Sequence, residues 1–416
     1  MDPIQTGLIQ LTCIEHEVIS QLTSITYVVP RYGEDVVGGA ESAARTLAEA
    51  LVTFGVRVKV ITTTARDYST WAPHYARGES TLNGVAVTRF DVDRERPANF
   101  SRHYRRVLAH PHSADFEEEK ALIWDQGPDS LEMLDAIAKL DEGIIVFYPY
   151  LYLPTVEGVA RSSLPKILHP AAHDEPIIDL SIFKRVFTSV DGLVYQTKAE
   201  RSFVERRFKV GQIPSIDLGM GIRSQSASND QVSDRVADIA RGKYVLVLGR
   251  VGKEKGSQMA ATFFESALDI FPTELKLVFA GPIEDDFVAS ERVVLLGRVS
   301  DSERETLLRN CLFLLSPSFQ ESFGLVILEA WQFGKATLVN GGCEATSELV
   351  ESSGGGLLFD DFQSFVAAIS LLVEDAELAN QLGLAGRNYG EVRYGLDGVI
   401  DRYLTFIEGV AKIHEA

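Results

Sequence analysis

Cysteine is scarce in this chain: its three cysteines, Cys13, Cys311 and Cys343, are scattered without the spacing of a metal site. A disulfide framework is therefore not expected, and this usage suits a reducing cytoplasm better than secretion. The sequence also lacks any apolar run near the roughly 18 residues of a membrane-spanning helix. Residues 1–22 have no basic start and carry acidic side chains, so they do not make a signal peptide. We expect a cytoplasmic protein with 1–22 as an N-terminal extension.

Basic residues are also fewer than acidic residues in this chain. Lysine and arginine together number 40 against 59 aspartates and glutamates, which gives a net charge of -19. This balance argues against nucleic acid as a partner. Basic stretches at 102–106 and 201–209 could make peripheral contact with an anionic membrane, although such helix faces are more often simply solvated. No cluster of metal-ligating residues is apparent, so we expect neither a metal nor a cofactor.

Strand and helix signals alternate through the chain from about residue 24. Short β-branched and aromatic runs are separated by amphipathic stretches such as 40–54. This order predicts parallel strands joined by helical crossovers, an α/β fold. The predicted strands are 24–30, 56–63, 143–150, 165–170, 191–197, 243–250, 275–282, 293–298, 311–318 and 335–342.

The length and 45% hydrophobic content favour two domains. A polar segment at 223–242 is interpreted as a linker, or as an elaborated connection, near their boundary. Neither first strand is followed by G-x-G-x-x-G or by a P-loop, which weakens a dehydrogenase or a P-loop NTPase. We expect two doubly wound, Rossmann-like domains facing across a cleft. Their predicted bounds are 23–215 and 216–392, with 393–416 as a helix packing back on the first.

The most informative segment is PSFQESFGLVILEAWQFG, residues 317–334. It predicts a helix from Gly324 to Gln332, ended by Gly334 as a left-handed cap, with Glu321 in the entering turn and Glu329 on the second turn. Chance could supply two glutamates at this spacing. However, the segment follows the carboxyl end of a predicted strand, where open α/β sheets bind ligands. The carboxylates and the helix N-terminus could then hold a hydroxyl-rich ligand.

A basic turn, GRVGKEKG at 249–256, follows the first strand of the second domain. Arg250, Lys253 and Lys255 stand among glycines at a strand-to-helix turn, where cations could neutralise a diphosphate. In the first domain, the loop with Gly38 and Gly39 leads into the predicted helix at 40–54. Glycines there bring backbone N–H groups close to a ligand.

Together these stretches resemble the GT-B glycosyltransferases of family 4 (glycosyl transferases group 1), which are retaining enzymes that use nucleotide sugars. The resemblance covers about residues 24–411 and is most specific at 317–334. The pattern G-R-[LV]-x-x-x-K-G falls on Gly249, Arg250, Val251, Lys255 and Gly256, and P-S-x-x-E-x-F-G-L-x-x-x-E-A-x-x-x-G falls on Pro317, Ser318, Glu321, Phe323, Gly324, Glu329, Ala330 and Gly334. The family's first-domain histidine is similar to His173, and its glycine-pair loop to Gly38 and Gly39 with Glu41.

The resemblance implies a nucleotide-sugar donor, a glycan, lipid or small-molecule acceptor, and transfer on one face of the sugar without a metal. The leaving phosphate would then help to deprotonate the acceptor. The implied catalytic residues are Glu321, His173, Arg250 and Lys255. The implied donor-binding residues are Gly39, Arg250, Lys255, Arg298, Val299, Glu321, Ser322, Phe323, Gly324, Leu325 and Glu329, and those on the acceptor side are Gly38, Gly39, Glu41 and His173.

The sequence departs from the family pattern at two positions: Ala336 and Cys343 stand where relatives often have proline. Three alternatives stay open: a GT-B nucleotide-sugar epimerase, a phosphorylase, and a non-catalytic sugar-nucleotide-binding protein. A glycosidase-like acid/base pair is disfavoured, because it has no use for the basic turn. Acceptor choice is assigned to first-domain loops at 65–82 and 92–128.

Overall fold

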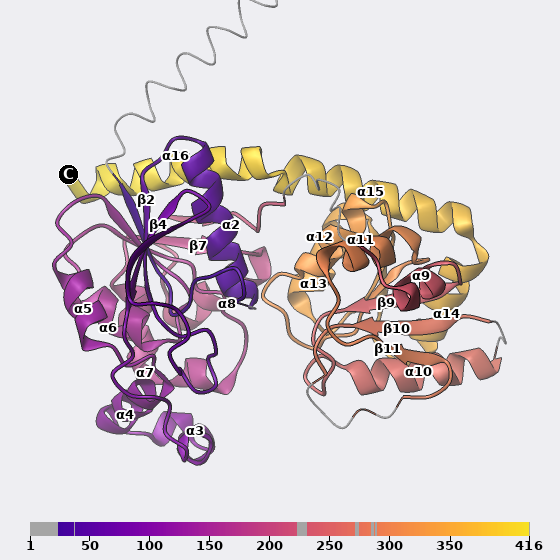
Figure 1. Cartoon of the computed structure of the whole chain (residues 1–416), viewed down its shortest axis with the longest axis horizontal. Helices are drawn as coiled ribbons and strands as arrows, with labels where there is room; N and C mark the ends of the chain where they lie inside the picture. The colour runs from indigo at the N-terminus through magenta and orange to yellow at the C-terminus, as the bar shows by residue number, and fades with distance from the viewer. Residues whose placement is uncertain are drawn as a thin grey trace, which may run out of the picture. The chain divides into compact units, whose positions relative to one another are not determined.

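The computed structural model describes residues 24–36, 38–222, 231–270, 274–283, 287 and 289–415, so the expected extension at 1–22 lies outside the described residues. The chain divides into two compact units (Figure 1). Unit 1 consists of the described residues up to Gln196, of Glu200–Leu218 and of the chain from Ile400 onward. Unit 2 consists of Thr197–Ala199 and Gly219–Val399.

Unit 1 is built on a mainly parallel sheet in the order β3-β4-β2-β1-β5-β6-β7-β8. Its central strands are apolar on both faces, as strands covered on both sides must be. The order reverses direction between β1 and β5, which both pair with their neighbours in parallel. The strands are β1 Ile25–Val28, β2 Val58–Thr63, β3 Gly78–Leu82, β4 Val85–Phe90, β5 Ile144–Phe147, β6 Lys166–Leu168, β7 Gly192–Tyr195 and β8 Ser215–Asp217.

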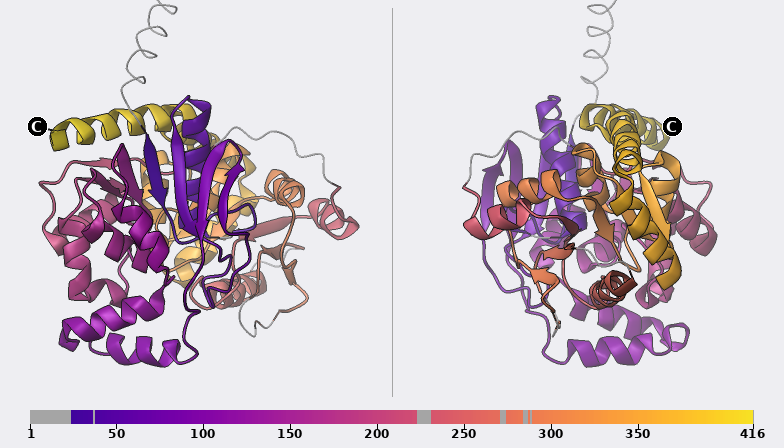
Figure 2. Two further views of the ribbon diagram at one scale, coloured as in Figure 1. Left: turned by 60° about the vertical axis from the view of Figure 1, so that its left-hand side comes forward. Right: turned by 90° about the vertical axis from the view of Figure 1, so that its right-hand side faces the viewer.

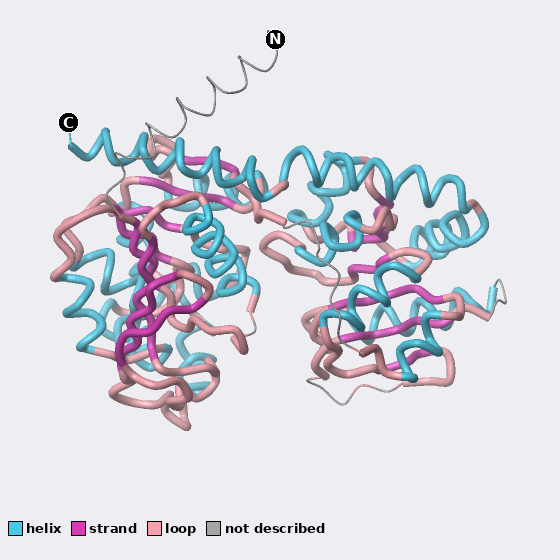
Figure 3. Tube along the Cα trace, turned by 45° about the horizontal axis from the view of Figure 1, so that its top comes forward, coloured by secondary structure: helices cyan, strands magenta, loops and turns pink. Residues whose placement is uncertain are grey.

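Helices border this sheet, as the cyan segments of Figure 3 show. In α2 (Gly39–Thr53), small alanines and leucines face the core at helical spacing. The remaining helices are α3 Phe100–Leu108, η1 Pro111–Ser113, α4 Phe116–Gln126, α5 Leu131–Ala138, α6 Leu153–Arg161, η2 Pro176–Asp179, α7 Ser181–Thr188, α8 Lys198–Phe208 and α16 Leu396–Glu415. Among the described residues, no helix has both the length and the apolar character needed to cross a membrane.

Two expectations for unit 1 are wrong. The predicted loop at 65–82 ends in β3, which pairs antiparallel with β4 and makes a hairpin at Asn83 and Gly84. The predicted loop at 92–128 contains α3, η1 and α4. α3 and α4 pack on one another at the end of unit 1 remote from α2 (Figures 1 and 2). β3 is mostly exposed, and α3 and α4 carry many charged side chains, so none of these segments contains a long apolar run.

A buried polar network connects Tyr403 of α16 to the sheet of unit 1. The Tyr27 hydroxyl donates to the Tyr403 oxygen at 3.1 Å, and His169 Nε2 lies 2.7 Å from the same oxygen. His169 also stacks on Tyr148, whose hydroxyl accepts a bond from Gln196 Nε2 at 2.6 Å. Burial lowers the pKa of His169 to about 3, so its imidazole is neutral at physiological pH.

Unit 2 is a parallel sheet in the order β11-β10-β9-β12-β13-β14. Its strands are β9 Tyr244–Leu248, β10 Lys276–Ala280, β11 Val293–Leu295, β12 Leu314–Ser316, β13 Thr337–Asn340 and β14 Gly356–Phe359. Its helices are α9 Asp234–Ala240, α10 Ser257–Ile270, α11 Asp301–Asn310, α12 Leu325–Gln332, α13 Glu344–Ser353, α14 Phe362–Glu374 and α15 Ala376–Tyr394. Each unit is thus a doubly wound α/β structure, as expected. The segment at 223–242 contains α9, so its described part is an elaborated connection rather than a bare linker, and 223–230 lie outside the described residues.

Candidate functional site

The candidate site of unit 2 lies where its strand order changes direction. β9 and β12 are neighbours in the middle of the sheet, with Leu314 opposite Leu246. The chain runs from β9 to one edge of the sheet and later returns at β12. The loops that follow two such strands diverge and leave a crevice at their carboxyl ends, which is where α/β sheets bind ligands. The basic turn follows β9, and the segment with Glu321 follows β12.

The basic turn is fixed by backbone bonds on both sides. Val251 donates its N–H to the Pro282 carbonyl at 2.8 Å, and Gly252 donates to Ser257 Oγ at 3.1 Å. Gly256 ends the turn with φ +66, and a Cβ there would overlap the carbonyl oxygen of Pro317. Glycine therefore allows this turn to pack directly against the end of β12.

A second close backbone approach lies at the ends of β9, β10 and β11. Gly249 donates to the Ala280 carbonyl at 3.0 Å, and Gly281 donates to the Gly297 carbonyl at 2.8 Å. Gly281 has φ +155, and a Cβ on it would overlap the backbone carbonyl of Gly249. The three chain segments could not come together at this spacing with a side chain at position 281.

The structure brings Lys255 and Glu321 together. Lys255 Nζ lies 2.6 Å from Glu321 Oε1, and the two side chains are 26% and 24% exposed. Both groups are therefore accessible to a ligand. Arg250 lies on the same turn and is exposed. A cation and a carboxylate predicted from separate motifs thus form one ion pair at the switch point.

The helix that follows Glu321 has the predicted form. Gly324 is its N-cap in the left-handed conformation with φ +95, α12 runs over Leu325–Gln332, and Gly334 follows with φ +65. Phe323 is buried, whereas Ser322 and Leu325 are half-buried. The N-terminus of α12 thus starts beside Glu321.

Glu329 lies on the second turn of α12 and is 22% exposed. Its Oε2 accepts a bond from Nη2 of Arg304 on α11. Burial raises the pKa of Glu329 above its ordinary value, while Arg304 acts in the opposite direction. No sequence motif marks Arg304 as the partner of Glu329. The only local signal is the capping box of Ser300 and Glu303, which fixes the start of α11 but does not indicate a partner on α12.

Arg298 and Val299 follow β11 and directly precede α11. Arg298 is exposed and Val299 is half-buried. Among the described residues, no ion pair or hydrogen bond joins Arg298 to Glu321 or Glu329. These two residues therefore lie at the same edge of the sheet as the basic turn, without direct contact to the glutamates.

A third loop joins the site after β13. Asn340 is buried, donates from Nδ2 to the Pro317 carbonyl at 3.3 Å, and accepts from the Gly342 N–H at 3.0 Å. Cys343 is a buried free thiol at the start of α13. The side chain of Asn340 links the two loops that follow β12 and β13.

In unit 1, three of the predicted acceptor-side residues, Gly38, Gly39 and Glu41, lie at the N-terminus of α2. Glu41 forms a buried ion pair with Arg31, whose side chain is 6% exposed. Gly38 caps α2 in an extended conformation, and Gly39 begins it. A Cβ at Gly38 would collide with the Glu41 carboxylate. Glu41 therefore holds Arg31 in place in this structure.

His173 lies in the loop after β6, and its side chain is 36% exposed. Its Nε2 is 3.8 Å from Glu175 Oε2, and Tyr150 donates its hydroxyl to Glu175 Oε1 at 2.9 Å. The preceding Ala172 donates its N–H to buried Glu200 at 2.7 Å. Burial raises the pKa of Glu200 to about 8. Glu200 and Glu175 thus hold the loop that presents His173.

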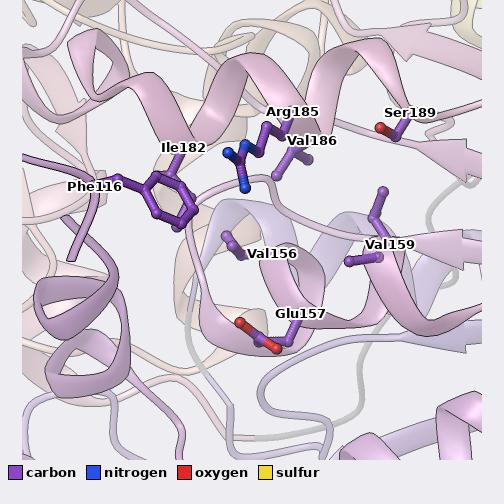
Figure 4. A pocket seen from close by; sticks show the side chains of 9 residues that line it. Phe116, Val156, Glu157, Val159, Ile182, Arg185, Val186 and Ser189 are labelled. Carbon is purple, nitrogen blue, oxygen red and sulfur yellow. The ribbon is translucent and has the colours of Figure 1, made fainter.

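Unit 1 also contains a small cavity of about 110 Å³, shown in Figure 4. Its lining is mostly apolar, with Arg185 stacked on the ring of Phe116 at 4.0 Å. None of the predicted site residues lines it. The lining residues come from α4, α6, α7 and the position after α7: Phe116, Val156, Glu157, Val159, Ala160, Ile182, Arg185, Val186 and Ser189. Within the described residues, no group of three or more His, Cys, Asp or Glu side chains could hold a metal ion.

Comparison with known proteins supports the expected family. Residues 231–389 match the family described as glycosyl transferases group 1. The chain is 30% identical over 185 residues to N,N'-diacetylbacillosaminyl-diphospho-undecaprenol alpha-1,3-N-acetylgalactosaminyltransferase of Campylobacter jejuni, covering 42% of this chain and 47% of that protein. It is 29% identical over 189 residues to alpha-1,3/1,6-mannosyltransferase ALG2 of Saccharomyces cerevisiae, covering 44% and 35%. The match thus spans less than half the length of either relative.

Solved structures match nearly the whole chain. Trehalose-6-phosphate synthase OtsA has a TM-score of 0.70 at 10% identity, covering 93% of this chain and 99% of that one. Sucrose-phosphate synthase of Thermosynechococcus elongatus has a TM-score of 0.65 at 17% identity, covering 93% and 98%. HepE of Anabaena in complex with UDP-glucose has a TM-score of 0.65 at 15% identity, covering 93% and 99%. These likenesses confirm the expected GT-B fold.

Proposed function

On the premise that residues 231–389 form a glycosyl transferases group 1 domain, we propose that the protein moves a sugar from a nucleotide-diphosphate sugar to an acceptor. The observation that carries this proposal is the pairing of Lys255 with Glu321 at the carboxyl ends of β9 and β12. One member can bind phosphate and the other can bind hydroxyl groups. A nucleotide sugar offers both at adjacent positions.

The proposed roles follow from the charges that develop during transfer. Breaking the bond between sugar and phosphate leaves negative charge on the diphosphate, which Lys255 and Arg250 would stabilise more in the transition state than in the ground state. Glu321 and the backbone N–H groups of 322–325 would hold the sugar hydroxyls and the nearby phosphate oxygens. Since Lys255 and Glu321 are paired with each other in the structure, donor binding would exchange this partner for a phosphate and a sugar hydroxyl.

By resemblance to family 4, transfer would retain the configuration of the donor sugar, with the leaving phosphate assisting the acceptor. Glu329 would accept bonds from the ribose, and Arg298 and Val299 would contact the base. On the acceptor side, His173 would orient the reacting groups, and Gly38, Gly39 and Glu41 would line the approach. The bond from the Ala172 N–H to Glu200 and the contact between Glu175 and His173 support a positioned rather than a mobile imidazole.

The Campylobacter jejuni relative is named for a diphospho-undecaprenol substrate and the yeast relative is named as a mannosyltransferase, so we propose a glycan or lipid-linked acceptor. A lipid-linked acceptor would require contact with a membrane surface. Arg102, Arg105 and Arg106 are exposed on α3 and supply cations suited to anionic headgroups.

We expect nucleotide sugars to stabilise the protein against heat. A ligand present at about 100 times its dissociation constant adds roughly 2.7 kcal/mol. The melting temperature should be measured with UDP-, GDP- and ADP-sugars, beginning with UDP-sugars because HepE of Anabaena binds UDP-glucose on the same fold. A flat response to all of them would contradict the proposal. With the stabilising donor, sugar transfer to an acceptor supports a transferase, and isomerised donor alone would indicate an epimerase.

We further propose that turnover needs no metal, because the fixed cations Arg250 and Lys255 can balance the diphosphate charge. Protein treated with EDTA should therefore keep its full rate of donor consumption, measured by release of the nucleoside diphosphate. A matched sample supplemented with Mg²⁺ or Mn²⁺ serves as the control. Loss of activity after EDTA and its return with either ion would overturn the metal-independent mechanism.

A further inference from the structure

The start of α11 is rigidly fixed beside the site. Ser300 Oγ accepts from the Glu303 N–H at 3.3 Å, and the Glu303 carboxylate accepts from the Ser300 N–H at 2.9 Å. Glu303 also accepts from Ser233, which precedes α9. These bonds lower the pKa of Glu303, so the carboxylate stays ionised and the cap stays closed. The first turn of α11 therefore holds Arg304 in a defined place.

From this first turn, Arg304 reaches the second turn of α12. Its Nη2 donates to Glu329 Oε2, and the two side chains are 37% and 22% exposed. Among the described residues, no bond is made to the other carboxylate oxygen of Glu329, which leaves Oε1 available to a hydroxyl donor. The pair is thus open to a ligand on one side.

We propose that Arg304 is a positioning residue that fixes the Glu329 carboxylate so that it accepts hydrogen bonds from the ribose of the donor. The inference rests on the proposed function and adds to it a residue outside the family motif. Arg304 also belongs to the segment that begins with Arg298 and Val299, the proposed base contacts. One short stretch, 298–304, would then set the positions of both base and ribose.

The alternative interpretation is that the ion pair of Arg304 and Glu329 only stabilises the packing of α11 on α12. In that case the affinity for the nucleotide would not depend on its ribose hydroxyls, whereas a carboxylate positioned to bind them would make it depend on them. A hydrogen bond to a charged group contributes about 1.5–3 kcal/mol, or roughly 10- to 100-fold in affinity. The two interpretations therefore differ in how strongly the protein distinguishes a ribonucleotide from its deoxy form.

The test measures binding by calorimetry for UDP, GDP and ADP, each with its 2′-deoxy and 2′,3′-dideoxy counterparts. For the diphosphate that binds best, we expect the wild type to prefer the ribose form at least tenfold. Arg304→Met should lower the affinity for the ribose form about tenfold and leave the affinity for the dideoxy form nearly unchanged, so that the preference for ribose is lost. Arg304→Lys, which keeps the charge, should recover part of it.

Arg309→Met is the matched control, because Arg309 lies on the same helix and pairs with Glu305 instead. This control should keep the wild-type preference. An Arg304→Met protein that distinguishes ribose from dideoxyribose as well as the wild type does would overturn the inference. If none of the three diphosphates bound the wild type, the proposed function itself would fall, and the inference with it.

A pH profile of nucleotide affinity gives a second readout. The charged groups that act on Glu329 are Arg304, which lowers its pKa, and Asp301, which raises it, both from α11. Removing Arg304 should raise the pKa of Glu329 further, so affinity should begin to fall at a higher pH as the solution is acidified. Affinity should be measured between pH 5 and 8. Coincident profiles for Arg304→Met and wild type would contradict the positioning role.

Discussion

Replacement of Lys255 by methionine is expected to lower kcat/KM for sugar transfer about 10²- to 10³-fold, the usual loss when one fixed group that stabilises transition-state charge is removed. Methionine keeps most of the volume of the lysine stem but cannot neutralise the diphosphate. Because the Lys255 side chain is 26% exposed, its removal should leave the fold intact. Steady-state rates of nucleoside diphosphate release would measure the loss.

The control for this result is Lys253→Met, a substitution on the same turn at an exposed side chain. It lowers the local positive charge by the same amount without touching Glu321. We expect a change of less than tenfold. Equal losses in the two variants would mean that Lys255 acts only through the general positive potential of the turn, and the assigned contact with the phosphate would be wrong.

Substitution of Gly281 by alanine is expected to have the largest effect on stability. The new Cβ would meet the backbone carbonyl of Gly249, and the residue would have to keep φ +155, so both backbone segments must move. We expect a loss of about 3 kcal/mol or more. For a unit of this size, that corresponds to a melting temperature lower by roughly 6–12 °C, which calorimetry can detect.

Gly297→Ala provides the comparison at the neighbouring loop. Gly297 also has a positive φ, +71, but a Cβ there would meet nothing within 4 Å. Only the backbone strain remains, which costs about 1 kcal/mol. If the two alanine variants had the same melting temperature, the close backbone approach at the ends of β9, β10 and β11 would not be the cause of the loss of stability.

Elements whose signals lie in contiguous residues could be predicted from the sequence. The helix α12, which ends shortly before Gly334, was predicted because its apolar run and glycine cap are contiguous. The hairpin of β3 and β4 was missed although Asn83-Gly84 is a strong two-residue turn signal, with both residues at positive φ. The exposed polar residues of β3 made this strand resemble a loop.

The side-chain contacts within the site could not be predicted from local sequence, because the partners are far apart in the chain. Lys255 and Glu321 are 66 positions apart, and their pairing depends on β12 returning beside β9. A motif shows that each residue is present but not that the two neutralise each other. The partner of Glu329 lies on a helix whose sequence, DSERETLLRN, contains several charges of similar local context. Only tertiary packing selects Arg304 among them.

The network of Tyr27, His169 and Tyr403 has a consequence for the order in which the chain folds during synthesis. Unit 1 begins with β1, yet the hydroxyl that satisfies Tyr27 and His169 is contributed by residue 403. Unit 2 ends at Val399. During synthesis, every residue of unit 2 therefore leaves the ribosome before Tyr403 can complete the buried polar network of unit 1. Unit 1 is thus the first unit to be synthesised and the last to be completed.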